Sequence, residues 1–232
     1  MKLIKNILFT VLTITIIFAG IKIYEGYNMY KTAISNMSIE EKVEQIKDNP
    51  NYTEYKDLSQ DYINAVVAVE DRRFFNHNGI DMISISRAIF IDLKNMELEE
   101  GGSTITQQLA KNTYFTQEKK VTRKIAEIFM AFEYEKNCTK EQIFELYVNT
   151  SYFGDGYYCV KDASEGYFDK LPKYMDLYEC TLLAGIPNAP SVYAPTKNPD
   201  LAKQRQAQVL RKMVSQGYIT KEEANQIMAV DE

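Results

Sequence analysis

The sequence predicts a mainly α-helical fold with one N-terminal transmembrane helix. Apolar residues recur every three or four positions through most of the chain, which is typical of helices. Capping motifs predict helix starts at Ser38, Thr139 and Thr220, and no segment shows a strong strand-like alternation of apolar and polar residues. With 232 residues, of which 45% are hydrophobic and 25% charged, the chain can form a packed core.

The N-terminal segment is apolar enough to cross a membrane. Residues 7–21 carry no charge, and flanking lysines can extend a span toward the usual length of about 20 residues. Lys2 and Lys5 precede this segment, which favours an N-terminus inside the cell and a main domain outside it. A cleaved signal peptide is the alternative, but residues 18–20 make a poor cleavage site. Either interpretation exports the chain from about Tyr24 onward.

The remaining chain divides into a linker and one domain. We expect a cytoplasmic stub and anchor over 1–24, a membrane-proximal linker with a helix over 25–59, and the main domain over 60–232. The linker helix begins at the Ser38 capping box and ends before Pro50. The later helices are predicted near 60–76, 81–97, 103–113, 119–136, 140–149 and 174–185, with a loop and short helix over 151–172 and two helices joined at Gly217 over 199–229.

Composition excludes several classes of function. The net charge of −5 gives no general attraction to nucleic acid. Three cysteines without CxxC spacing form neither a disulfide framework nor a zinc site. The single histidine, His77, argues against a zinc hydrolase and against a Ser-His-Asp triad.

Glu70 lies on an apolar helical face. On a helical wheel it falls within one stripe of apolar residues, made of Ile63, Val66, Val67 and Phe74. A carboxylate on such a stripe is desolvated, its pKa rises, and it becomes a better proton acceptor. The alternative is a helix-end glutamate paired with Arg73 or another cation, and this helix alone does not decide between the two.

A second group of polar residues lies in the segment GGSTITQQLAKN over 101–112. Ser103 can cap a helix, and one narrow polar face follows it, made of Thr104, Gln107, Gln108 and Lys111. Free N–H groups at a helix start, uncharged donors and one lysine suit an anionic or sugar ligand. An ordinary amphipathic helix is the alternative, although its solvated face would more often carry Glu and Lys.

A third group follows in a helix whose predicted core stripe is Val121, Ile125, Ile128, Phe129 and Phe132. Arg123 and Glu127, four residues apart, point away from that stripe, so this helix alone indicates a solvated ion pair. The glycine- and proline-rich segments 152–156 and 183–191 predict shaped loops, but turn chemistry names no ligand.

Taken together in order, these segments resemble the bacterial peptidoglycan glycosyltransferase family, whose domain occurs alone or in front of a transpeptidase in penicillin-binding proteins. The match runs through EDRRFFNHNGID, GGSTITQQLAKN, RKIAE, YFGDG with a later YF, and LLAGIPNAPSVYAP, over roughly 60–215. The resemblance implies a monofunctional, membrane-anchored transglycosylase. It also implies a lysozyme-like, mainly α fold with a small lobe near the membrane, and makes 60–232 the glycosyltransferase domain.

The resemblance assigns roles residue by residue. Glu70 matches the catalytic base and Glu127 the second essential acid. The positions that match the family's substrate-binding blocks are Asp71, Phe74, His77, Ser103, Thr104, Gln107, Gln108, Lys111, Arg123 and Lys124. His77 is expected to be a structural hydrogen-bonding residue. The sequence departs from the family pattern at Cys159 and Asp169, where glycine is common, and at Asn188, where glutamine is frequent.

The implied reaction is polymerisation of lipid II. The acceptor's GlcNAc 4-OH attacks the donor's MurNAc with inversion, and undecaprenyl pyrophosphate leaves. Glu127 would orient the cations Lys111 and Arg123 or hold a divalent cation, Mg²⁺ or Mn²⁺, on the pyrophosphate; no other cofactor is expected. The expected partners are lipid II, the growing glycan strand, the bilayer and other cell-wall synthases, and no nucleic acid.

The implied location is the plasma membrane, with a single span and the catalytic domain on the extracytoplasmic face. Apolar residues at Phe115 and 89–91 are expected either to dip into lipid or to belong to the core. Two other functions remain as alternatives, a lysozyme-like enzyme that cleaves glycan and an inactive cell-wall scaffold.

Overall fold

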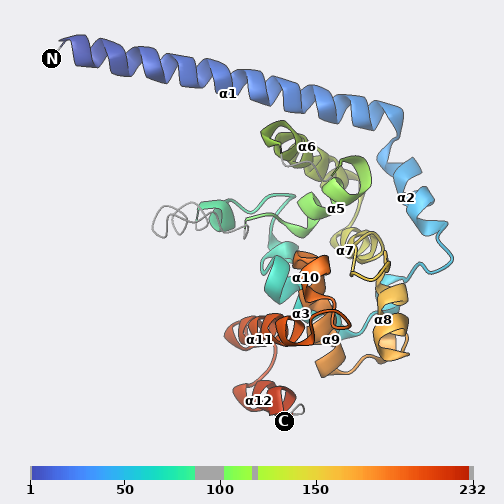
Figure 1. Ribbon diagram of the computed structural model, residues 1–232. Helices are drawn as coiled ribbons and strands as arrows, with labels where there is room; N and C mark the ends of the chain where they lie inside the picture. Colours follow the sequence, from blue (N-terminus) through green and yellow to red (C-terminus); the bar gives the residue numbers. More distant parts are fainter. Residues whose placement is uncertain (1, 87–101, 117–119, 230–232) are drawn as a thin grey trace.

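The computed structural model describes residues 2–86, 102–116 and 120–229, and over these residues the protein is helical with no strand (Figure 1). This confirms the mainly α prediction. The helices are α1 (Lys2–Asn36), α2 (Ile39–Lys47), α3 (Gln60–Glu70), α5 (Ile105–Tyr114), α6 (Val121–Asn137), α7 (Lys140–Val148), α8 (Val160–Phe168), α9 (Leu177–Gly185), α10 (Pro190–Tyr193), α11 (Pro199–Ser215) and α12 (Lys221–Ala229). The short 3₁₀ turns are η1 (Tyr55–Asp57), η2 (Phe74–Asn76), η3 (Pro172–Tyr174) and η4 (Ile186–Asn188).

The N-terminal helix α1 is long and apolar enough to cross a membrane. Residues 4–36 form the candidate span, with a mean hydropathy of 2.1 in its most apolar window and none of that window buried in the protein. The helix continues without a break past residue 24, where the anchor was expected to end. Its last turns pack on α6, and Tyr30 is buried there. The division of the chain at residues 24 and 59 stays a prediction.

Capping chemistry fixes the start of several helices. Ser38 and Thr139 form the predicted capping boxes of α2 and α7, and Thr220 exchanges hydrogen bonds with Glu223 at the start of α12. Predicted helix ends were less accurate. The helix expected to reach residue 76 ends at Glu70, because Asp71 leaves helical geometry and its carboxylate binds elsewhere. Of the helix expected over 81–97, residues 82–86 are helical and 87–97 lie outside the described residues.

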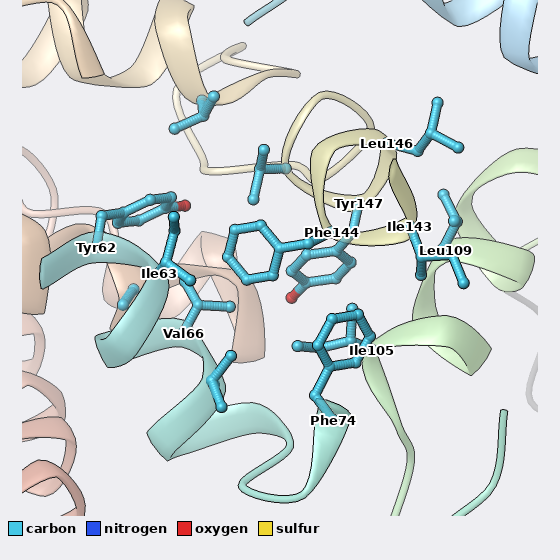
Figure 2. Packing of buried hydrophobic residues seen from close by; sticks show 14 of the residues in the cluster. Tyr62, Ile63, Val66, Phe74, Ile105, Leu109, Ile143, Phe144, Leu146 and Tyr147 are labelled. Carbon is cyan, nitrogen blue, oxygen red and sulfur yellow. The ribbon is translucent and has the colours of Figure 1, made fainter. Parts of the chain in front are cut away.

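The core joins α3, α5 and α7. Figure 2 shows Phe144 and Tyr147 of α7 lying between the apolar side chains of α3 and those of α5. The stripe predicted around Glu70 is buried, since Ile63, Val66, Val67 and Phe74 all belong to this core. Helices α9 and α11 pack on α3 from the other side. As a result the C-terminal end of α3, which carries Glu70, is enclosed by protein.

The prediction of which face of α6 is buried was wrong. Val121 is 67% exposed and Phe132 is 42% exposed. The buried residues of this helix are instead Ala126, Glu127, Met130, Ala131 and Tyr134. Both α1 and α5 pack on α6, so it has two covered faces and an apolar stripe does not identify the inner one.

Candidate active site

The Glu70 side chain is held away from bulk solvent at the C-terminal end of α3. It is 9% exposed. One oxygen, Oε2, accepts a hydrogen bond of 2.7 Å from Nε2 of Gln108 on α5. The other, Oε1, lies 3.4 Å from Nη2 of Arg205 on α11. Glu70 is therefore fixed from two sides by groups that come from two other helices.

Opposing influences set the proton affinity of this carboxyl group. Burial raises the pKa of Glu70 above its ordinary value. The hydrogen bond from Gln108 and the charges of Arg205 and Lys111 lower that pKa, although burial outweighs them. A carboxylate with a raised pKa and a fixed orientation is suited to accept a proton from a weakly acidic hydroxyl. Of the two interpretations left open for Glu70, the geometry combines both, with Arg205 rather than Arg73 as the cation.

The polar face predicted on α5 is divided between two uses. Thr104, rather than Ser103, is the N-cap, and it forms a buried capping box with Gln107. Thr104 also donates a 2.6 Å hydrogen bond to the carbonyl of Gly79. These two side chains hold the start of α5 in place. Gln108 and Lys111, further along the helix, are partly exposed and lie toward Glu70.

The start of α5 does not present the free N–H groups that were expected. The N–H of Ile105 donates to Oδ2 of Asp71 at 3.0 Å, and that of Gln107 donates to the Thr104 hydroxyl. An acidic side chain of the protein already occupies this helix start, where an anionic ligand would otherwise be favoured. The expectation of free N–H groups at this helix start was therefore wrong, whereas the anionic or sugar ligand expected for the segment stays a prediction.

The side chains of Asp71 and His77 form a hydrogen-bonded pair inside the protein. Nε2 of His77 lies 2.9 Å from Oδ2 of Asp71, and both side chains are nearly buried. Asp71 also accepts the hydrogen bond from the N–H of Ile105, so this pair connects the segment after α3 to the start of α5. Phe74 is fully buried against Phe144. The substrate-binding roles of Asp71, Phe74 and His77 stay predictions, because these contacts are all within the protein.

The ion pair on α6 is buried and not solvated as its helix alone indicated. Glu127 is 1% exposed and contacts two cations, Arg123 and Lys124. Lys124 also donates to the hydroxyl of Ser103, just before α5. The prediction failed because it took this face of α6 to be outward, whereas Glu127 is buried and Lys124 contacts the residue Ser103 just before α5. The result is a second acidic site, next to the same loop that starts α5.

A metal ion does not fit the residues around Glu127. That carboxylate is buried between two cations, and a divalent cation there would meet their repulsion. Within the described ranges, no group of three or more His, Cys, Asp or Glu side chains is arranged to hold a metal. The geometry therefore favours Glu127 as a residue that orients cations, and the divalent cation expected at the pyrophosphate stays a prediction.

Arg205 was missed by the sequence analysis. It lies 135 positions from Glu70 and reaches it only through the packing of α11 on α3 and α9. Its guanidinium also lies over the ring of Tyr193, and its Nε donates to the carbonyl of Gly185. No local pattern marks this arginine among the other cations of its helix. Only the tertiary contact identifies it.

The three residues that differ from the family pattern lie at helix ends and turns. Cys159 is buried as the N-cap of α8, and its sulfur accepts from the N–H of Asp162. Asp169 ends α8 in the left-handed region at φ 55°, where glycine is favoured. Asn188 lies in η4. These departures therefore lie at turns and caps and leave the contacts of Glu70 and Glu127 intact.

Comparisons with known proteins agree with this arrangement. A family model described as Transglycosylase matches residues 37–214. The "Putative transglycosylase" of Cupriavidus necator is 42% identical over 174 residues, which cover 75% of each protein. Penicillin-binding protein 1F of Bacillus subtilis is 45% identical over 160 residues, 69% of this chain and 22% of that protein. Penicillin-binding protein 1A of Aquifex aeolicus is 43% identical over 172 residues, 74% of this chain and 24% of that protein.

The matched region contains both acidic sites and every helix that positions them. It extends over most of this chain and over three quarters of the Cupriavidus necator relative, but over only about a quarter of the two penicillin-binding proteins. The ordered motifs, the enclosed Glu70 and these matches together show that the chain belongs to the transglycosylase family, in agreement with the predicted peptidoglycan glycosyltransferase class.

Proposed function

We propose that this peptidoglycan glycosyltransferase joins lipid II units into glycan strands with Glu70 as its general base. The observation that carries the proposal is the enclosed Glu70 carboxylate, held between Gln108 and Arg205. A sugar hydroxyl is a weak nucleophile and needs a positioned base to remove its proton. The raised pKa of Glu70 suits that step.

The reaction is a single displacement. The 4-OH of the acceptor's GlcNAc forms a bond to the anomeric carbon of the donor's MurNAc, and its proton passes to Glu70. The bond from that carbon to the undecaprenyl pyrophosphate breaks, and the leaving group takes the electron pair. Attack from the opposite face converts the α-linked donor into a β-linked product.

The leaving group needs cations more than it needs a proton, because a pyrophosphate is a stable anion. Lys111 acts electrostatically on Glu70, so its positive charge lies near the proposed reaction site. Arg123 and Lys124 are oriented by the buried Glu127. In this proposal Glu127 is a positioning residue for those cations, and no step is derived through a metal ion.

A substrate that is anchored in the bilayer would explain why the protein carries the apolar helix α1. Both lipid-linked sugars are held in the bilayer by their prenyl chains, so the enzyme must work at the membrane surface. We place the protein in the plasma membrane with a single span and with the catalytic domain on the extracytoplasmic face. The apolar α1 and the lysines before it support this topology.

The test is a lipid II polymerisation assay with the full chain in detergent or in vesicles. Glu70→Gln is expected to lower kcat by about 10²–10⁴-fold, since loss of a general base has that effect. Glu165→Gln, on the exposed part of α8, is the matched control and should polymerise normally. Lys111→Ala is expected to raise the KM for the donor more than Glu70→Gln does.

Two outcomes would contradict the proposal. Polymerisation at the wild-type rate by Glu70→Gln would remove this residue as the base. Release of sugar fragments from finished glycan, without consumption of lipid II, would instead identify a glycan-cleaving enzyme.

A further inference from the structure

The hydroxyl of Tyr147 contacts the side chain that holds Glu70. Tyr147 is 1% exposed, and its ring belongs to the core between α3 and α5 (Figure 2). Its hydroxyl donates a hydrogen bond of 3.4 Å to Oε1 of Gln108. Gln108 in turn donates from Nε2 to Oε2 of Glu70 at 2.7 Å. Three side chains, from α7, α5 and α3, therefore form one hydrogen-bonded chain that ends on the carboxylate.

The direction of this chain depends on how the Gln108 amide is turned. A glutamine amide has a carbonyl that accepts and an NH₂ group that donates, and a half-turn of the amide exchanges their places. An ionised carboxylate only accepts, so a carbonyl turned toward Glu70 would set two acceptors against each other. When Tyr147 donates to the carbonyl, it keeps the NH₂ group on the side of Glu70.

The Tyr147 hydroxyl keeps its proton while a carboxylate titrates. Burial and, after it, the charge of Glu70 raise the pKa of Tyr147 well above its ordinary value. The phenol is therefore available as a donor throughout the acidic and neutral range in which Glu70 gains or loses its proton.

The length of the hydrogen bond limits the size of its effect. Hydrogen bonds in a chain strengthen one another, because a carbonyl that accepts makes the N–H groups of the same amide better donors. The bond from Tyr147, at 3.4 Å, is longer than the usual O–H···O distance of about 2.7–2.8 Å. We therefore expect Tyr147 to adjust the stability of the ionised Glu70 and not to determine it alone.

We propose that Tyr147 is a positioning residue for the general base, because its hydroxyl turns the Gln108 amide so that the NH₂ group faces Glu70 and stabilises the ionised carboxylate. The inference rests on the proposed function, which makes Glu70 the base. Core packing alone does not require the hydroxyl, since Phe144, one turn earlier on α7, fills the same core with a plain ring.

Several other groups act on the proton affinity of Glu70. The charged ones are Arg205 from α11, Lys111 from α5 and the neighbouring Asp71. Tyr62, a buried phenol on α3 itself, is also close enough to interact electrostatically with Glu70. A variant that removes only the Tyr147 hydroxyl leaves all four groups in place, so a change in the titration of Glu70 reports the hydrogen-bonded chain.

Tyr147→Phe is that variant, and it keeps the ring that the core needs. Without the donor, the Gln108 amide can turn its carbonyl toward Glu70, and the ionised form loses part of its stabilisation. The acidic limb of the kcat/KM profile for lipid II polymerisation is expected to move to higher pH by about 0.5 unit. A uniform loss at every pH, with the limb in its wild-type place, would show a merely structural effect and overturn the inference.

Tyr134→Phe is the matched control. Tyr134 of α6 is also buried, and its hydroxyl lies 2.9 Å from that of Thr113, which belongs to α5 and follows Gln108 by five residues. This variant loses the same kind of contact to the same helix without touching the chain that ends on Glu70. It should keep the wild-type profile, and an equal shift in both variants would overturn the inference.

Removal of the amide should remove the effect of Tyr147. Gln108→Met keeps an unbranched side chain of similar length but has no amide to orient. In that background Tyr147→Phe is expected to cause no further shift of the acidic limb. A shift as large as in the wild-type background would mean that Tyr147 acts on Glu70 by another route, which contradicts the inference.

An infrared titration without substrate separates this inference from the proposed function. The carboxyl C=O band that the full chain shows and Glu70→Gln lacks belongs to protonated Glu70, and its intensity against pH follows the titration of this group. A midpoint at higher pH in Tyr147→Phe than in the wild type supports the inference, and equal midpoints overturn it. A shifted midpoint in a chain that does not polymerise lipid II would contradict only the proposed function.

Discussion

A general base has two requirements, and they favour opposite shifts of the pKa of Glu70. A base must be ionised before the reaction, and it must also bind a proton strongly during it. Burial raises the pKa of Glu70, which favours proton binding. Gln108 and Arg205 stabilise the ionised form, which keeps the group available. The pair of contacts thus sets a balance, and a change in either one should be visible in the pH dependence of the reaction.

The pH profile tests the role of Arg205. Its charge lowers the pKa of Glu70, so Arg205→Gln should raise that pKa further. The acidic limb of the kcat/KM profile is therefore expected to move to higher pH, with the largest loss of activity on that acidic limb. Arg211→Gln, on an exposed part of the same helix, is the control and should keep the wild-type profile. A proportional loss at every pH would mean that Arg205 does not act through Glu70.

At this scale, local pattern predicted part of the site. Glu70 was recognisable because its apolar neighbours lie within one helix, at positions fixed by the helical repeat. Arg205 was not, because its contact depends on how two distant helices pack. Thr104 and Gln107 were assigned to a ligand-facing surface, but both are buried, and Thr104 binds the carbonyl of Gly79. A wheel shows which side chains share a face and not what covers that face.

Among the helices, the end of α8 shows how one residue carries local strain. Asp169 adopts φ 55° and ψ 36°, a conformation that an L-residue with a side chain reaches at a cost. None of the hydrogen bonds described for the chain uses its carboxylate. Asp155 also has a positive φ, of 51°, but its carboxylate accepts from Tyr167 and pairs with Lys197.

Glycine substitutions at these two positions should have opposite effects. Asp169→Gly removes the strain and is expected to raise the free energy of unfolding by about 0.5–1 kcal/mol. Asp155→Gly relieves similar strain but loses the contacts with Tyr167 and Lys197, so it should be neutral or destabilising. Denaturant or thermal unfolding in detergent measures both. A loss of stability in Asp169→Gly would show that its side chain makes a contribution that outweighs the strain.

Helix positions were more predictable than helix faces. Most of the predicted helices in the described ranges have a counterpart in the structure, because caps and apolar spacing are local signals. The inner face of α6 was mistaken because apolar residues lie on two sides of it, toward α1 and toward α5. Helix α1 was expected to end with its apolar segment, yet it continues because its later aromatic residues pack on Phe129.

For the whole molecule, the contact between α1 and α6 joins the apolar helix to the catalytic domain. Gly26 makes this approach possible, since a Cβ there would come within 2.6 Å of the Ile125 side chain and 2.9 Å of the Thr122 carbonyl. Tyr27 and Tyr30 of α1 pack on Phe129, which lies one turn after Ile125 on α6. Tyr30 also donates to Glu133 at 3.0 Å. The two helices are thus held together by close packing and by a polar contact.

Adding one methyl group at Gly26 should loosen this joint. Gly26→Ala is expected to destabilise the packed state by about 1–3 kcal/mol, the usual cost of overpacking. Gly20→Ala is the matched control, because a Cβ at Gly20 meets nothing within 4 Å. Thermal unfolding in detergent measures the difference. Equal melting temperatures for the two variants would mean that the close approach at Gly26 does not contribute to stability.

The unbroken course of α1 has a mechanical consequence. A helix of 35 residues is about 50 Å long, and this one runs from the apolar segment into its seat on α6 without a loop that could act as a pivot. If the apolar segment is embedded in a bilayer, this helix and its contact with α6 hold Glu70, the proposed base, at a fixed distance from the lipid surface. Under the proposed function, the growing strand rather than the enzyme would then have to move during elongation, because α1 has no break that could act as a hinge between the apolar segment and its contact with α6.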